Sequence, residues 1–210
     1  MKRPRSWLGP LLGTLLSFAA VSGVCAQAAP RPLAESLTGQ ARSDYESGRI
    51  LFNDGDHAGA LVKFQRAYDD SGDVRLLWNV AVCEKNLRHY ANVLRLLTRY
   101  RDEGRSLIAP EQASQVEEIL QTVRLLISTV HLYVTPDGAA VFVDNAQVGV
   151  TPLTKPLLVD LGTRRIRLEK PGWKTHVVTQ DFAGGSDVSI HIDMQRELNE
   201  GRLSINSEPD

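Results

Sequence analysis

The apolar residues of this chain follow two different periods, one before and one after Ser128-Thr129. Upstream, they recur at helical spacing with almost no internal proline. Downstream, β-branched residues alternate with polar ones, and turn signals such as Pro136-Asp137-Gly138 interrupt them at short intervals. The pattern predicts a helical domain over residues 34–129, followed by a smaller β-domain over residues 130–197.

The first helices are expected to form an antiparallel hairpin. One helix runs from the late thirties to residue 54, the next covers residues 56–70, and a Gly-Asp pair between them breaks the helix. Ala60, Phe64 and Ala67 lie at i, i+4 and i+7 and therefore share one face. This alanine, aromatic, alanine spacing resembles the second half of a tetratricopeptide (TPR) repeat.

A second hairpin and a closing helix are expected to follow, which makes five helices in all. Asp73 is a suitable N-cap for the next helix, the chain turns near Arg88-His89, and the returning helix ends at Arg101. The closing helix starts at Pro110, where proline fits a first helical turn. Its apolar stripe consists of Val116, Ile119, Leu120, Val123 and Ile127.

The TPR resemblance implies a docking role for the helical domain. TPR domains hold a peptide or a helix of a partner protein on the concave surface made by the first helix of each pair. In this chain, that surface would draw on Tyr45, Arg49, Phe52, Asn79 and Glu84. The implied partner of this groove is a protein or a peptide.

The downstream part resembles a PEGA domain over residues 132–145, 148–153 and 165–173. The motif that names the family reads Pro136-Asp137-Gly138-Ala139 here, with Asp where the family usually has Glu. PEGA modules occur on secreted and surface proteins, so the resemblance implies attachment to a cell-wall or surface polymer. An alternative reading makes this module a carbohydrate or peptidoglycan binder, with the helices as a spacer.

Strand patterning predicts a small antiparallel β-sandwich independently of that resemblance. Val141 and Val143 point to one side of their strand while Phe142 points to the other, which is typical of a sheet with one buried face. Asp144-Asn145 suits a hairpin, and Pro171-Gly172 suits a type II turn. We assign backbone roles to the remaining turn residues, namely Gly149, Pro152 and a hairpin at Gly184-Gly185.

Three aromatic residues of the β-domain are candidates for exposed ligand contacts: Tyr133, Phe142 and Trp173. Trp173 follows a turn, so it serves equally well as a plug for the sandwich edge. Arginines gather in two groups, which are solvated faces or contacts for an anionic polymer. They are Arg88, Arg95, Arg99, Arg101 and Arg105 in the helices, and Arg164, Arg165 and Arg167 in one strand.

The first residues have the features of a secretory leader. A basic start at residues 1–5 precedes an apolar run over 7–24, and Ala26-Gln27-Ala28 provides the small residues that signal peptidases prefer. We expect cleavage after residue 28, with an uncleaved anchor or lipid attachment at Cys25 as alternatives. The mature chain would then lie in the periplasm, the cell envelope or outside the cell, without a membrane span.

Removal of this leader would change the net charge from −1 to −4 and leave Cys83 as the single cysteine. A mildly acidic chain is a poor nucleic-acid binder, and one cysteine forms no intramolecular disulfide. At the other end, residues 198–210 resemble the start of a second PEGA unit: Leu203, Ile205 and Pro209-Asp210 repeat the spacing of the first.

The sequence lacks the common signatures of an enzyme or a metal site. It contains no Gly-x-Ser-x-Gly elbow and no His-Glu-x-x-His helix. His191 and Asp193 share one face of a strand, so a metal site or a hydrolase that uses His191 is the remaining alternative. We expect a protein that is not an enzyme and that needs no cofactor.

Overall fold

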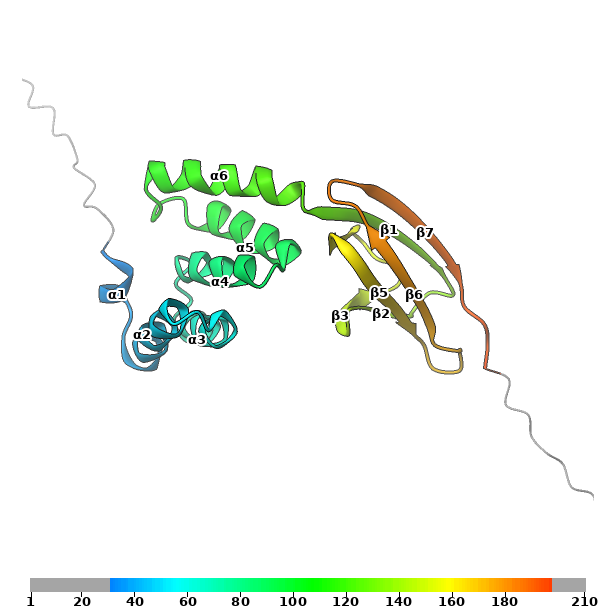
Figure 1. Cartoon of the computed structure of the whole chain (residues 1–210). Helices are drawn as coiled ribbons and strands as arrows, with labels where there is room; N and C mark the ends of the chain where they lie inside the picture. The colour runs from blue at the N-terminus through cyan, green and yellow to red at the C-terminus, as the bar shows by residue number, and fades with distance from the viewer. Residues whose placement is uncertain (1–30, 198–210) are drawn as a thin grey trace, which may run out of the picture. The chain divides into compact units, whose positions relative to one another are not determined.

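A computed structural model describes residues 31–197, so the predicted leader and the tail at 198–210 lie outside the described residues. Helices come first and strands follow, as predicted (Figure 1). The helices are α1 (Leu33–Ser36), α2 (Gly39–Asn53), α3 (His57–Ser71), α4 (Leu76–Asn86), α5 (Tyr90–Glu103) and α6 (Pro110–Arg124). The strands are β1 (Ile127–Thr135), β2 (Ala140–Val143), β3 (Ala146–Val150), β4 (Leu157–Asp160), β5 (Gly162–Glu169), β6 (His176–Phe182) and β7 (Asp187–Asp193).

Helices α2 and α3 form the first hairpin. Gly55 in the turn has a φ of 82°, and the Asp56 carboxylate caps α3 by accepting the Gly59 N–H over 2.8 Å. Ala60 and Ala67 have no exposed surface and Phe64 is 3 % exposed, so the predicted stripe is the buried face of α3. Small residues on this stripe allow the neighbouring helices to approach closely.

The start of α4 differs from the prediction. Asp73 is not its N-cap, because the helix begins three residues later, at Leu76. The Asp73 carboxylate accepts the backbone N–H of Arg75 and also pairs with the Arg75 guanidinium over 2.6 Å. An Asp carboxylate that accepts backbone N–H groups can cap a helix. In this chain, the Asp73 carboxylate instead organises the loop before α4. The next turn is where the sequence placed it, with Arg88 at a φ of 63°.

Helix α6 closes the helical part, but its apolar stripe is shorter than predicted. Val116, Leu120 and Val123 are buried against α4 and α5, whereas Ile127 is the first residue of β1. The β-domain therefore begins at residue 127, three residues before the predicted boundary. The short helix α1 precedes the first hairpin and had no counterpart among the five expected helices.

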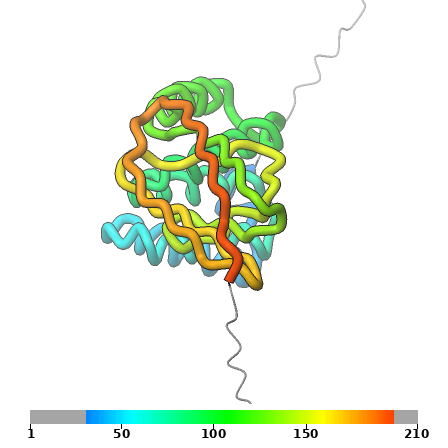
Figure 2. The backbone as a smooth tube through the Cα atoms, turned by 90° about the vertical axis from the view of Figure 1, so that its right-hand side faces the viewer, coloured from blue at the N-terminus to red at the C-terminus, as the bar shows by residue number. Residues whose placement is uncertain are grey.

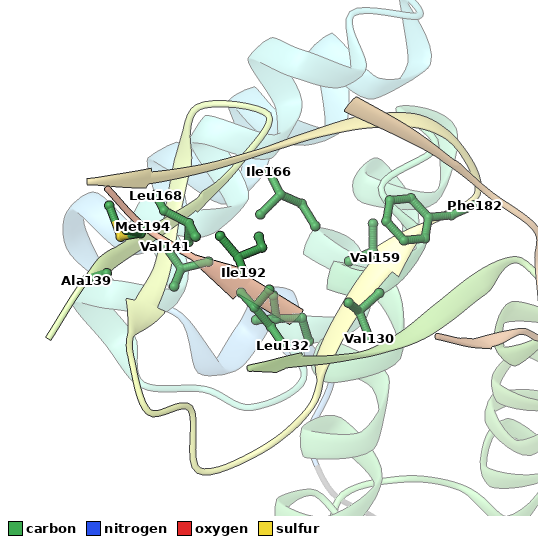
Figure 3. Packing of buried hydrophobic residues seen from close by; sticks show 11 residues of the cluster. Val130, Leu132, Ala139, Val141, Val159, Ile166, Leu168, Phe182, Ile192 and Met194 are labelled. Carbon is green, nitrogen blue, oxygen red and sulfur yellow. The ribbon is translucent and has the colours of Figure 1, made fainter. Parts of the chain in front are cut away.

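The strands form two sheets with the orders β4-β1-β7 and β3-β2-β5-β6. Val130, Leu132 and Val159 of the first sheet point toward Val141 and Ile166 of the second, which makes one core between the sheets (Figure 3). All pairs are antiparallel except one: β7, red in Figure 2, runs parallel to β1. The predicted β-sandwich therefore forms, with one parallel pair that alternation alone did not reveal.

Two turns of the β-domain are as predicted, and a third is not. Asp144 and Asn145 both have positive φ, 46° and 75°, and join β2 to β3 as a two-residue hairpin. The Trp173 N–H bonds to the Lys170 carbonyl over 3.0 Å, which closes the predicted turn at Pro171-Gly172. Gly184-Gly185 is not a hairpin, because β6 and β7 belong to different sheets.

Gly184 is required by a close approach of two backbone segments. A Cβ at this position would lie 2.1 Å from the carbonyl oxygen of Leu125. The Gly185 N–H in turn bonds to the Ile127 carbonyl over 2.7 Å. The loop between the sheets therefore packs directly against the segment that leads into β1.

Candidate functional site

A groove of about 240 Å³ lies between α2 and α4, with α3 beneath it. Its lining residues come from all three helices: Tyr45, Arg49, Phe52, Asn53, Phe64, Trp78, Asn79 and Val82. Four of the five residues predicted to contact a partner are among them, namely Tyr45, Arg49, Phe52 and Asn79. The structure thus brings together residues that lie more than twenty-five positions apart in the sequence.

The floor of this groove depends on one glycine. Gly48 faces α3, and the ring of Phe64 fills the space where a Cβ would lie. The Tyr45 ring packs on Phe64 at a centroid distance of 5.9 Å, and Phe52 lies 5.0 Å from the ring of His57. Tyr45 and Phe52 are seven residues apart, two helical turns, so both line the same side of α2.

The rim of the groove is polar. The Arg49 guanidinium lies 5.9 Å from the centroid of the Tyr45 ring and forms no ion pair within residues 31–197. Amide groups of Asn53 and Asn79 lie on the same rim. An aromatic floor with one cation and two amides suits an apolar side chain that lies next to a carboxylate.

Glu84, the fifth predicted contact, lies outside this groove. It is 8 % exposed, and its carboxylate bonds to His89 Nδ1 over 2.6 Å and to the Asn92 amide over 2.9 Å. Both partners follow the turn between α4 and α5. Glu84 therefore holds this turn closed and contributes no lining to the groove.

Four lining residues were not predicted as contacts: Phe64, which was expected only on the shared face of its helix, and Asn53, Trp78 and Val82. Trp78 also packs on Tyr100, with ring centroids 5.9 Å apart, so it belongs to the core and to the groove at once. Helical spacing could have identified two of them, because Trp78 and Val82 are four residues apart and lie beside Asn79 on one side of α4.

The Pro136–Ala139 motif has a backbone role. Gly138, with a φ of 82°, donates its N–H to the Thr151 carbonyl over 2.7 Å. Ala139 donates to Thr151 Oγ1 over 3.0 Å and accepts the Thr151 N–H over 2.9 Å. The Lys170 ammonium donates to the Asp137 carbonyl. The bonds with Thr151 tie the loop before β2 to the segment after β3, beside Gly149 and Pro152.

The three aromatic candidates of the β-domain differ in exposure. Trp173 is partly buried, pairs with Arg196 as an isolated bridge and lies 5.3 Å from its guanidinium, so it covers an edge of the sandwich. Phe142 is covered by Arg167 at 4.1 Å. Tyr133 remains 53 % exposed and stacks on His191, with ring centroids 4.7 Å apart.

Several of the clustered arginines already have protein partners. Arg164 donates to Asp144 over 3.0 Å and to two backbone carbonyls. Arg99 pairs with Glu103 over 2.6 Å, and Arg101 pairs with Glu117 over 3.2 Å. These side chains stabilise local structure, so they form a weaker positive patch than the sequence suggested.

The second part of the chain is similar to a known family of protein modules. Residues 127–198 match the PEGA domain family. The match covers about a third of the chain and indicates a binding or attachment module. No curated protein matches this chain. Within residues 31–197, no three His, Cys, Asp or Glu side chains gather as a metal site, and no helix is long and apolar enough to cross a membrane.

Proposed function

We propose that this protein is an exported, non-catalytic adaptor whose helical part is a short TPR stack that docks a partner protein. The PEGA domain attaches the adaptor to material of the cell envelope or cell surface. The observation that carries this proposal is the groove, in which Tyr45, Arg49, Phe52 and Asn79 meet over the ring of Phe64. The groove lies where the first helices of two successive hairpins, α2 and α4, face each other.

The chemistry of the groove defines the partner segment. Aromatic surface from Tyr45, Phe52 and Trp78 would bury an apolar side chain of that segment. Arg49 would then pair with a carboxylate on the same segment, since it forms no ion pair with other described residues. The preferred partner is therefore a peptide or helix with an acidic residue beside a large apolar one.

The proposed export of the adaptor rests on the leader sequence, which lies outside the described residues. The basic and apolar pattern of residues 1–28 is the only support for it. Expression of the full chain in its native cells, followed by fractionation and N-terminal sequencing, tests this step. We expect a mature chain that starts near residue 29 in the envelope fraction; recovery of the uncleaved chain from the cytoplasm would contradict it.

The docking groove can be tested with full-length variants. A photoreactive amino acid in place of Asn53 would crosslink the partner in intact cells, and mass spectrometry would identify the crosslinked segment. A synthetic copy of that segment is then titrated against purified protein, and the signal is tryptophan fluorescence, to which Trp78 of the groove contributes. We expect Arg49→Glu and Phe52→Ala each to weaken binding at least tenfold.

Ile50→Ala is the matched control, because Ile50 is on the same helix but 62 % exposed and lines no part of the groove. It should leave the affinity unchanged. If Arg49→Glu and Phe52→Ala bind the segment as well as the wild type does, the groove is not the docking site.

A glycan-binding module with the helices as a spacer remains the second candidate. The exposed Tyr133 on the surface of the sandwich favours it. One comparison distinguishes the two functions. If the protein is an adaptor, the groove variants abolish capture of a partner protein; if it is a glycan-binding module, they leave all binding intact.

A further inference from the structure

The outer face of the three-stranded sheet combines an aromatic stack with polar side chains. On β1, the outward residues are Thr129, His131, Tyr133 and Thr135. On β7, they are Asp187, Ser189, His191 and Asp193. The residues between these on both strands face the core. The alternation of side chains along each strand therefore determines which residues lie on the outer face.

Tyr133 and His191 form the centre of this face. They are direct neighbours across the parallel pair, and their rings lie 4.7 Å apart with planes only 20° from parallel. Each ring uses one face for this stack. Since Tyr133 is 53 % exposed, much of its remaining surface is open to a ligand. A rigid aromatic surface of this kind binds the flat C–H face of a pyranose ring.

The polar groups around the stack are carboxylates, hydroxyls and the imidazole of His131. Asp187 pairs with His131 over 3.2 Å, while Asp193 forms no ion pair with the described residues. Asp193 lies two residues from His191, about 7 Å along the strand. The outward rows of β1 and β7 contain no lysine or arginine. This charge pattern disfavours a polyanion and favours a ligand that carries positive charge.

We infer that this outer face of β1 and β7 binds an amino-sugar glycan, a polymer whose sugars carry free ammonium groups. A sugar ring stacks on Tyr133, and the carboxylate of Asp193 accepts a hydrogen bond from the ammonium of that sugar or of the next one. Thr135 and Ser189 are exposed hydroxyls within the same rows and bond to ring hydroxyls. The inference rests on the proposed attachment role of the PEGA domain and names its ligand class and its site.

A glycan fits this face better than a peptide does, because of its shape. The outward side chains repeat every two residues, about 6.6 Å, along two parallel strands. An extended polymer that lies along the strands meets such a row repeatedly, whereas a peptide needs pockets for its side chains. The outer face of a sheet offers a row of contacts and no enclosed volume.

The test is a calorimetric titration of the full chain with two probes, hexamers of β-1,4-linked glucosamine and of N-acetylglucosamine. We expect the glucosamine hexamer to bind at least fivefold more tightly at low salt. Tyr133→Ala should weaken its binding at least tenfold. Asp193→Asn should abolish the preference for the free amino group, because it keeps the shape of the side chain and removes its charge.

Phe142→Ala is the matched control, since Phe142 is an outward aromatic residue of the other sheet and lies under Arg167. It should leave both affinities unchanged, and thermal unfolding should show that every variant is folded. Equal binding of the two hexamers, no binding of either, or unchanged binding by Tyr133→Ala would overturn the inference.

The failure of this inference can be distinguished from failure of the proposed attachment role. If the wild type sediments with purified envelope material and Tyr133→Ala sediments equally well, attachment stands and this face is not responsible. If the wild type does not sediment with envelope material but binds the glucosamine hexamer through Tyr133, the site stands and the proposed attachment does not.

Discussion

Gly48 of α2 lies so close to Phe64 of α3 that a Cβ on Gly48 would come within 2.8 Å of two ring carbons. The absence of a side chain at this position lets the Phe64 ring lie between the helices and form the floor of the groove. The contact links stability to the proposed docking site, because the residue that packs the hairpin also shapes the surface beside it.

Gly48→Ala should therefore destabilise the helical part. Overpacking of a core costs about 1–3 kcal/mol, and the better helix propensity of alanine returns up to roughly 1 kcal/mol. Chemical unfolding followed by circular dichroism measures the net loss. Ser43→Ala, at an exposed position of the same helix, is the control and should change stability little. A Gly48→Ala variant as stable as the wild type would contradict the contact.

The ion pair between Asp44 and Lys63 predicts a loss of stability in acid. Lys63 Nζ donates to Asp44 Oδ1 over 2.6 Å, and this hydrogen bond lowers the pKa of Asp44 below its ordinary 3.8, with a smaller contribution from Gln40. Because the pKa is lower in the folded state, the stabilisation is complete above the unfolded pKa and is lost as the pH falls from about 4 through the folded pKa.

Asp44→Asn should flatten the dependence of unfolding free energy on pH below about 4, as measured by urea unfolding at several pH values. Asp54→Asn removes an exposed carboxylate at the end of α2 and serves as the control. Some dependence on pH will remain, because the pKa of Asp73 is lowered as well. Burial raises the pKa of Asp73, but the hydrogen bonds from Arg75 outweigh this effect. Identical pH profiles for Asp44→Asn and the wild type would exclude this role of the pair.

Cys83 should be unreactive in the folded protein. It has no exposed surface, and burial, together with the neighbouring Glu84 carboxylate, raises its pKa from 9.0 to about 11. In a Cys25→Ser background, where Cys83 is the only thiol, a thiol reagent should react slowly at pH 8 and rapidly after unfolding. Because the folded pKa is raised, the protein should also lose stability as the pH rises from 9 toward 11. Rapid labelling under native conditions would show that the thiol is accessible.

Thr151 should be important for the stability of the β-domain. Its hydroxyl accepts the N–H of Ala139, and both residues are buried. Thr151→Val keeps the shape but leaves that N–H without an acceptor, which costs about 1–3 kcal/mol. Thr151→Ser retains the hydroxyl and should recover most of the loss. Thermal unfolding of the three proteins provides the comparison, and equal loss in both variants would point to packing rather than the hydrogen bond.

The sequence predicted elements well where the spacing of side chains determined a face. Ala60, Phe64 and Ala67 revealed the buried side of α3 because helical spacing makes them neighbours. The TPR resemblance assigned Tyr45, Phe52 and Asn79 to one surface, and the structure shows that they line one groove. Helical spacing alone determines the face of α3, whereas the groove also depends on how α2 and α4 pack.

The errors arose where several arrangements share one local signal. An Asp before an apolar run suits an N-cap, but the Asp73 carboxylate is held by Arg75 and the helix starts at Leu76. Alternation shows which side of a strand is buried, but it names neither the neighbouring strand nor its direction. The parallel pairing of β1 with β7 and the crossover at Gly184 both depend on contacts between residues far apart in the chain.

The pairing of β1 with β7 joins segments far apart in the chain, unlike the helical hairpins. Each helical hairpin joins segments that are close in sequence, so it can form as soon as its second helix has emerged. The β-domain must bring Val130 to Val188 and Val134 to Ile192, which closes a long loop. A chain that ends before Asp187 would leave β1 with β4 as its one strand neighbour and the core open on that side. The core between the two sheets can therefore be completed only when the final strand of the β-domain is available.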